Sequence, residues 1–152
     1  MTNPVLTIGI PVFDDFHGLR STVQSLRIFH SKEMPRCEIV VINNNPDSPH
    51  GKMIADFSRW PDNGLADFRH IPYRVQGSAA AKQAVFDNAA GDVVLCIDSH
   101  VEIYPGVINK ILSFDPKTFG KNLYQGPVMF DDCTTFQTDF NMVWGNAMYG
   151  QW

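Results

Sequence analysis

Short apolar runs alternate with amphipathic stretches along the chain. Residues 5–12 and 37–42 are mostly apolar runs and residues 93–97 a fully apolar one, all rich in β-branched side chains, and they predict buried strands. Residues 17–29 place apolar side chains at helical spacing, and residues 77–90 are rich in alanine, so both segments are predicted helices. Strands without period-two alternation, separated by helices, predict an α/β fold with a mostly parallel sheet and helices on both faces.

Three weaker elements complete the predicted order. We expect a helix over residues 51–60, a less regular strand over 67–73, and one further strand over 123–129 ahead of an aromatic, polar tail. Gly91 is predicted to end the Ala-rich helix as its C′ residue. No internal repeat or linker divides the chain, so we expect a single domain over residues 1–152.

Composition narrows the classes of function. The chain has 12 Lys and Arg against 16 Asp and Glu and no basic run, so nucleic acid is not an expected partner. Three cysteines without a CxxC pair argue against a disulfide framework or a thiolate zinc site. No apolar stretch approaches the roughly 20 residues of a membrane helix, and the N-terminus lacks the features of a signal peptide. We therefore expect a cytoplasmic protein without a membrane span, and homo-oligomer formation is left open.

The ends of the predicted strands define where a ligand would bind. In open α/β sheets, ligands bind outside the carboxyl ends of the strands. That rule selects Asp14 and Asp15 after the first strand, residues 43–47 after the second, and Asp98 with His100 after the run at 93–97. If the last two strands flank the first, the three ends line one crevice.

The tripeptide Asp98-Ser99-His100 is the sharpest chemical signal. A carboxylate and an imidazole two residues apart can both reach one divalent cation if the chain turns there, and such a cation could bridge a diphosphate. The same tripeptide also makes an ordinary capping turn. The Ala-rich helix begins with small residues that permit close approach by a ligand, and it carries Lys82 one turn inside. Plain packing of that helix, with Lys82 in solvent, is the alternative.

Four segments together resemble a known family. They are Ile10-Pro11 near the end of the first strand, Asn-Asn-Asn-Pro-Asp at 43–47, Gly-Ser-Ala-Ala-Ala-Lys-Gln at 77–83, and Gly-Asp-Val-Val-Leu-Cys-Ile-Asp-Ser-His at 91–100. Their order resembles a family 2 type glycosyltransferase of the GT-A, Rossmann-like fold. The stretch Asp-Ser-His-Val-Glu-Ile, a DxH in place of the usual DxD, is similar to that of the polypeptide N-acetylgalactosaminyltransferases.

The resemblance implies a metal-dependent enzyme that transfers a glycosyl group from a nucleotide-diphosphate sugar to an acceptor. It places the ligands of the metal, Mn²⁺ or Mg²⁺, and of the diphosphate on Asp98 and His100. Asn43 stands where the family often has Asp, and Lys82-Gln83 replace Arg-Asn. The implied nucleotide contacts are Pro11, Phe13 and Asn43 for the base, Ser99 near the ribose, and Lys82.

The resemblance leaves the catalytic residues unassigned. In the family, a catalytic carboxylate and, in the N-acetylgalactosaminyl group, a third metal-binding His come further downstream, so we expect the chain to lack the C-terminal acceptor part. Asp131 and Asp132 are expected near the acceptor side. The alternative function is a truncated or degenerate GT-A module that binds nucleotide or carbohydrate, or mediates assembly, without turnover. A sugar-phosphate nucleotidyltransferase is disfavoured, because residues 9–14 are not a Gly-rich phosphate loop.

Overall fold

The computed structural model describes residues 5–60, 67–115, 117 and 124–138. Backbone contacts divide the chain into two compact units, Met1–Thr118 and Phe119–Trp152, each of which is treated by itself below. The first unit contains the sheet expected from the apolar runs. Among the described residues, no helix is long and apolar enough to cross a membrane.

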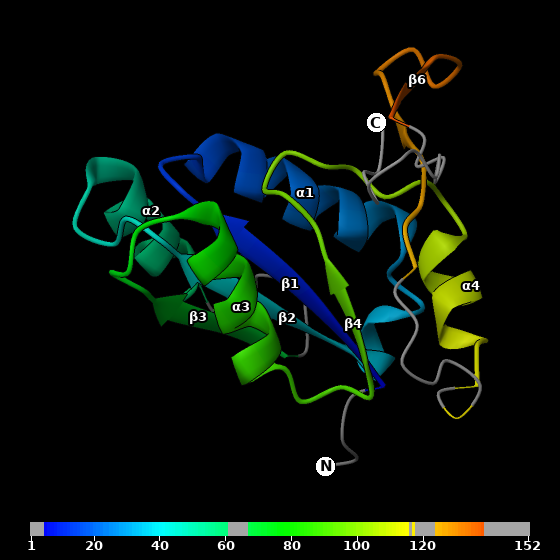
Figure 1. Cartoon of the computed structure of the whole chain (residues 1–152), viewed down its shortest axis with the longest axis horizontal. Helices are drawn as coiled ribbons and strands as arrows, with labels where there is room; N and C mark the ends of the chain where they lie inside the picture. Colours follow the sequence, from blue (N-terminus) through cyan, green and yellow to red (C-terminus); the bar gives the residue numbers. More distant parts are fainter. Residues whose placement is uncertain (1–4, 61–66, 116, 118–123, 139–152) are drawn as a thin grey trace, which may run out of the picture. The chain divides into compact units, whose positions relative to one another are not determined.

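The first unit is built on a four-stranded parallel sheet (Figure 1). β1 lies between β2 and β4, as the crevice prediction required, and Ile8 of β1 pairs with Ile39 on one side and Leu95 on the other. All strands point their carboxyl ends to the same edge. The strands, in spatial order, are β3 (Phe68–Pro72), β2 (Cys37–Asn43), β1 (Leu6–Val12) and β4 (Val93–Cys96).

Helices cover both faces of this sheet, which confirms the predicted layers. On one face, α1 (Phe16–Phe29), α2 (Pro49–Phe57) and α4 (Val107–Leu112) share a core with the side chains of β1. On the other face, α3 (Ser78–Asn88) is the helix that packs on the sheet within the described part of the chain. The buried contacts under α3 are made by Ala81, Ala84 and Val85 against Val40 and Ile42.

Several boundaries differ from the predicted ones for local reasons. The helix expected over 51–60 begins at Pro49, because the Ser48 side chain caps it by accepting a hydrogen bond from the Gly51 amide. The 3₁₀ turn η1 (Met34–Arg36) and the short helix α4 carry no strong sequence signal and were not predicted.

Gly91 does not end α3, which corrects the capping prediction. The helix stops at Asn88, its C-cap residue Ala89 is extended, and Gly91 does not adopt a positive φ. A Cβ on Gly91 would lie 2.6 Å from the Thr7 amide nitrogen of β1. Glycine is needed here because the chain passes directly against β1, not because a helix turns left-handed at its end.

A buried carboxylate fastens this same end of α3 to the sheet. Glu38 of β2 accepts hydrogen bonds from the Thr7 hydroxyl at 2.5 Å and from the Ala90 amide at 2.6 Å, and its other oxygen lies 3.1 Å from Arg69 Nε. Arg69 also donates to the carbonyl of Asn88. The contacts tie three strands and the α3–β4 loop together at the amino edge of the sheet.

In the second unit, the described residues form a small antiparallel pair, β5 (Val128–Met129) and β6 (Phe136–Thr138). Of the strand expected over 123–129, only Val128–Met129 is a strand, because residues 124–127 are described and have no regular structure. Most of the aromatic tail lies outside the described residues. In the turn, Asp132 accepts bonds from the Thr135 hydroxyl and from the Thr134 and Thr135 amides, which lower its pKa to about 2. Such a stabilised carboxylate is a poor proton acceptor.

Candidate functional site

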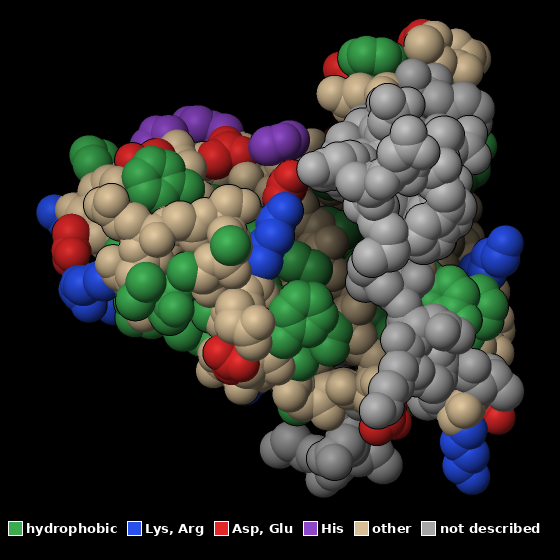
Figure 2. Space-filling model, viewed as in Figure 1, with side chains coloured by type: hydrophobic (Ala, Val, Ile, Leu, Met, Phe, Trp, Pro, Cys, Tyr) green, Lys and Arg blue, Asp and Glu red, His purple; other side chains and the backbone are tan. Residues whose placement is uncertain are grey.

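A cleft of about 610 Å³ opens at the carboxyl edge of the sheet in the first unit. Its volume lies within the range of about 300–1,000 Å³ that is usual for small-molecule sites. Figure 2 shows histidine, acidic and basic side chains close together along this edge of the molecule. The lining residues are Pro11, Val12, Phe13, Asp15, Asn44, Gln76, Gly77, Ser78, Ala81, Lys82, Asp98, Ser99 and His100. Of the residues that the resemblance assigned to the metal and the nucleotide, all except Asn43 are among them.

Strand alternation decides which side chains reach the cleft. Successive side chains of a strand point to opposite faces. Ile10 and Val12 of β1 are buried in the core under α1, so Pro11 and Phe13 face the side of the sheet that α3 covers. Phe13 lies just beyond the strand and is 56% exposed. These two residues form an apolar wall of the cleft.

The same alternation decides where Asn43, the predicted base contact, lies. This residue is fully buried and faces α2, where its Nδ2 donates to the Gly51 carbonyl at 2.9 Å and lies 3.1 Å from His70 Nε2. Asn44, one residue on, faces the cleft. Its Nδ2 donates to the Val75 carbonyl at 2.7 Å and so supports the β3–α3 loop.

The start of α3 gives the cleft its positive side. Gly77, the N-cap residue, has a φ of 119°, and a Cβ there would meet nothing within 4 Å, so the first turn is open to the cleft. Lys82 projects from the second turn, and its Nζ lies 3.6 Å from Asp98 Oδ1. Both side chains are about half exposed, at 46% and 54%. The Lys82 ammonium group therefore pairs with the Asp98 carboxylate at the cleft, which the start of α3 also lines.

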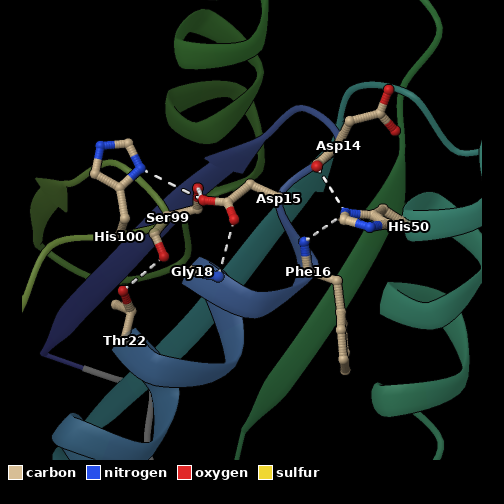
Figure 3. A network of polar contacts seen from close by, with 8 residues as sticks. All are labelled: Asp14, Asp15, Phe16, Gly18, Thr22, His50, Ser99 and His100. Atoms are coloured by element: carbon tan, nitrogen blue, oxygen red, sulfur yellow. Dashed lines mark hydrogen bonds and ion pairs between the residues drawn. The ribbon is translucent and has the colours of Figure 1, made fainter.

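Asp15 lies at the centre of the polar contacts that join the start of α1 to Ser99 and His100 beside the cleft (Figure 3). Its Oδ1 accepts the Gly18 amide at 2.9 Å and caps α1, while its Oδ2 accepts the Ser99 hydroxyl at 2.7 Å and lies 3.4 Å from His100 Nδ1. Burial raises the pKa of Asp15, but the bonds from Ser99, Gly18 and His100 outweigh it and hold the pKa below its ordinary 3.8. The group is ionised at neutral pH.

The loop between β1 and α1 is held in an uncommon backbone conformation. Asp14 has a φ of 52°, in the left-handed region. Its Oδ2 accepts a bond from Asn45 Nδ2 at 2.8 Å, and its carbonyl lies 2.7 Å from His50 Nδ1. A left-handed conformation costs a non-glycine residue about 1–2 kcal/mol. These contacts offset that cost and fix the loop that presents Phe13 and Asp15.

The donor set suits a cation shared with a phosphate ligand. Within the described ranges, no group of three or more His, Cys, Asp or Glu side chains could hold a metal ion alone. Mg²⁺ typically binds one or two protein carboxylates and takes its other ligands from substrate phosphates and water. Asp98, His100 and the adjacent Asp15 at the cleft edge fit that kind of site and do not form an all-protein cage.

Sequence reasoning placed Asp15 and Asn44 among the strand ends that line the crevice, but it assigned neither residue a role in the site. Asp15 was noted as a strand tip, but its capping pattern, Asp followed by Gly three residues later, gave no sign of a second role. Asn44 was hidden among three consecutive asparagines, where only the register of β2 decides which side chain faces the cleft. Asn44 N donates to the Val12 carbonyl, which extends that register past the strand.

Comparisons with known proteins agree with this fold. No curated protein matches the chain. Among solved structures, TarS 1–349 of S. aureus is 15% identical with a TM-score of 0.53, and the match covers 70% of this chain and 30% of that one. A longer S. aureus TarS chain is 17% identical with a TM-score of 0.52, over 70% of this chain and 18% of that one. TarS 1–349 in complex with UDP-GlcNAc is 14% identical, with a TM-score of 0.49.

The family follows from a match along most of the sequence. The model of glycosyl transferase family 2 matches residues 7–143, which include the sheet of the first unit apart from Leu6 and all the residues that line the cleft. The parallel sheet with helices on both faces is the architecture that the resemblance implied. The chain belongs to glycosyl transferase family 2.

Proposed function

We propose that the cleft binds a nucleotide-diphosphate sugar together with a divalent cation, and that the domain takes part in metal-dependent transfer of the glycosyl group. The observation that carries the proposal is the meeting of Asp98, His100, Lys82 and the start of α3 at one edge of a family 2 sheet. Three strand ends and a helix N-terminus thus converge on a volume suited to a nucleotide.

The charges around the cleft support a diphosphate position between its two walls. Lys82 and the first-turn amides of α3 offer positive potential on one side. On the other side, Asp98 and His100 would hold Mn²⁺ or Mg²⁺ against the phosphate oxygens. When bound, such a cation offsets the negative charge that develops on the departing diphosphate.

The remaining residues suit the nucleoside. Pro11 and the exposed ring of Phe13 offer an apolar surface for a base. The Ser99 hydroxyl donates its hydrogen to Asp15, so its oxygen lone pairs are left to accept a bond from a ribose hydroxyl. Asn44, in place of Asn43, is the amide on the cleft side of β2.

The second candidate is a module that binds the nucleotide or a carbohydrate without turnover. The matched part of the chain covers 30% of TarS 1–349, so the activity of such a whole protein is itself a proposal for this chain. Slow hydrolysis of a sugar nucleotide without acceptor separates the two candidates. We expect hydrolysis with at least one donor in the presence of Mn²⁺, and its absence across donors and metals favours the binding module.

The binding site itself is tested with nucleoside diphosphates. We expect UDP, GDP or dTDP to raise the unfolding temperature with Mn²⁺ and to do so less without it, because a ligand that binds only the folded state stabilises it. Asp98→Ala and His100→Ala should abolish the Mn²⁺-dependent part of nucleotide binding in calorimetry. Unchanged binding in both variants would contradict the assignment of the cation site.

The cytoplasmic location stays a prediction, checked by cell fractionation.

A further inference from the structure

The carboxylate of Asp15 makes more contacts than helix capping requires. Capping α1 needs one acceptor for the Gly18 amide, and Oδ1 supplies it at 2.9 Å. The other oxygen, Oδ2, reaches Ser99 and His100, which are 84 and 85 positions away in the sequence (Figure 3). One side chain therefore connects the first turn of α1 to the segment that follows β4.

The contact also fixes the hydrogen positions on its partners. An ionised carboxylate only accepts hydrogen bonds, so the Ser99 hydroxyl and His100 Nδ1 must both donate. Neutral His100 then carries its proton on Nδ1, and Nε2 keeps a free lone pair. His100 is 71% exposed, and Asp15 is the polar partner that the structure gives its ring within the described residues. Nothing else there selects the tautomer.

Two independent features hold this arrangement in place. The Thr22 hydroxyl, two turns further along α1 and fully buried, donates to the Ser99 carbonyl at 2.7 Å, so Ser99 is fastened to α1 through both its side chain and its backbone. At Gly18, a Cβ would lie 2.1 Å from Asp15 Oδ2. Only glycine at that position leaves the carboxylate room for its observed orientation.

We propose that Asp15 is a positioning residue of the cleft: its carboxylate sets the orientation and tautomer of His100, so that Nε2 is the nitrogen presented to a cation. The inference rests on the proposed function for the identity of the ligand. Outer partners of this kind, in which a carboxylate accepts the other N–H of a metal-binding histidine, typically change metal affinity by about 10–100-fold when removed.

Two variants separate this role from helix capping. Asp15→Ser keeps a good N-cap residue, but its single oxygen serves the Gly18 amide and leaves Ser99 and His100 without an acceptor. Gly18→Ala keeps the carboxylate and displaces it. Asp92→Ser is the matched control, since it removes an exposed carboxylate at the amino end of β4, the end remote from the cleft.

The first measurement needs no ligand. Long-range ¹H–¹⁵N spectra of the imidazole groups, with His100 assigned by its absence in His100→Gln, report which ring nitrogen carries the proton. We expect the Nδ1–H form in the wild type and in Asp92→Ser, and loss of that form in Asp15→Ser and Gly18→Ala. Wild-type tautomer populations in Asp15→Ser would overturn the inference, whatever the chain binds.

The second measurement uses Mn²⁺ with UDP, GDP or dTDP in calorimetry. We expect Asp15→Ser to weaken Mn²⁺-dependent binding by about 10–100-fold and Asp92→Ser to leave it unchanged. Wild-type affinity in Asp15→Ser, alongside loss in His100→Ala, counts against the positioning role. If the wild type binds none of these nucleotides, the proposed function fails, and the tautomer comparison still decides the role of Asp15.

Discussion

A Cβ on Gly9 would lie 2.0 Å from Cγ1 of Val85, so α3 rests directly on the backbone of the central strand. Val85 is fully buried, and Ala81 and Ala84 are small buried residues on the same sheet-facing side of α3. The close approach places the start of α3, with Gly77 and Ser78, at the same sheet edge as Asp98.

We predict that Gly9→Ala destabilises the protein by about 1–3 kcal/mol, the usual cost of overpacking a filled core. The added methyl group should also move α3 and weaken nucleotide binding, because Lys82 belongs to that helix. Urea unfolding and calorimetry measure the two effects. The double variant with Val85→Ala should recover part of both losses, and strict additivity of the two substitutions would contradict the packing argument.

The two neighbouring asparagines should give opposite results. Asn43→Ala removes a buried donor to the Gly51 carbonyl, so we expect a loss of about 1–3 kcal/mol in the free energy of unfolding. Its nucleotide affinity, measured at a temperature where the variant is folded, should match that of the wild type. Asn44→Ala frees the Val75 carbonyl beside the cleft and should weaken binding instead. Equal effects on binding would contradict the assignment of the two residues to opposite faces.

Lys82 should matter for the ligand and little for the fold. Its pair with Asp98 is half exposed, and such pairs contribute about 0–1 kcal/mol. Lys82→Met keeps the length of the side chain and removes its charge, so we expect weaker nucleoside diphosphate binding with a reduced salt dependence. Lys110→Met on α4 is the control with the same loss of charge. Calorimetry at two salt concentrations measures how the nucleotide affinity of each variant changes with salt. If that change is the same in Lys82→Met and Lys110→Met, Lys82 does not contact the phosphates.

His70 should make stability depend on pH below neutrality. Burial lowers its pKa below the ordinary 6.5, and the charge of Arg59 lowers it further. Between the folded pKa and 6.5 the unfolded chain therefore binds a proton that the folded chain excludes, so the free energy of unfolding rises with pH in that window and is level above it. Relative to His70→Gln, the wild type should lose stability as the pH falls below 6.5, measured by urea unfolding from pH 5 to 8. A difference that is constant with pH would contradict this prediction.

Much of the fold followed from the apolar runs. Residues 5–12 and 37–42 contain one polar residue each, Thr7 and Glu38, and do not alternate polar with apolar positions, because both faces of β1 and β2 are covered. That pattern is visible without tertiary information. The carboxyl-edge rule then placed Asp98 and His100 at the cleft. Site residues at the ends of neighbouring strands could be predicted from the sequence, because an α/β sheet allows only a few strand orders.

The sequence could not predict side-chain positions that change with a one-residue shift in strand register, or contacts between residues far apart in the chain. Asn43 and Asn44 are chemically identical in sequence, and only the buried face of β2 separates them. Gly91 resembles a helix-ending glycine until its approach to Thr7, 84 positions away, is known. Asp15 likewise fits a local helix-capping pattern, so the neighbouring sequence gives no sign of its contact with Ser99.

The position of β1 in the middle of the sheet also affects how the cleft forms during synthesis. Leu6 pairs with Cys37 on one side and with Val93 on the other, so β1, which precedes the other three strands of this sheet in the sequence, cannot gain its second neighbour until residue 93 has been synthesised. A nascent chain that ends before residue 93 has an unpaired apolar edge on β1, the kind of edge that pairs with other chains. The same length of chain must be made before Asp15 can meet Ser99. Closure of the sheet and assembly of the cleft therefore depend on the same late segment.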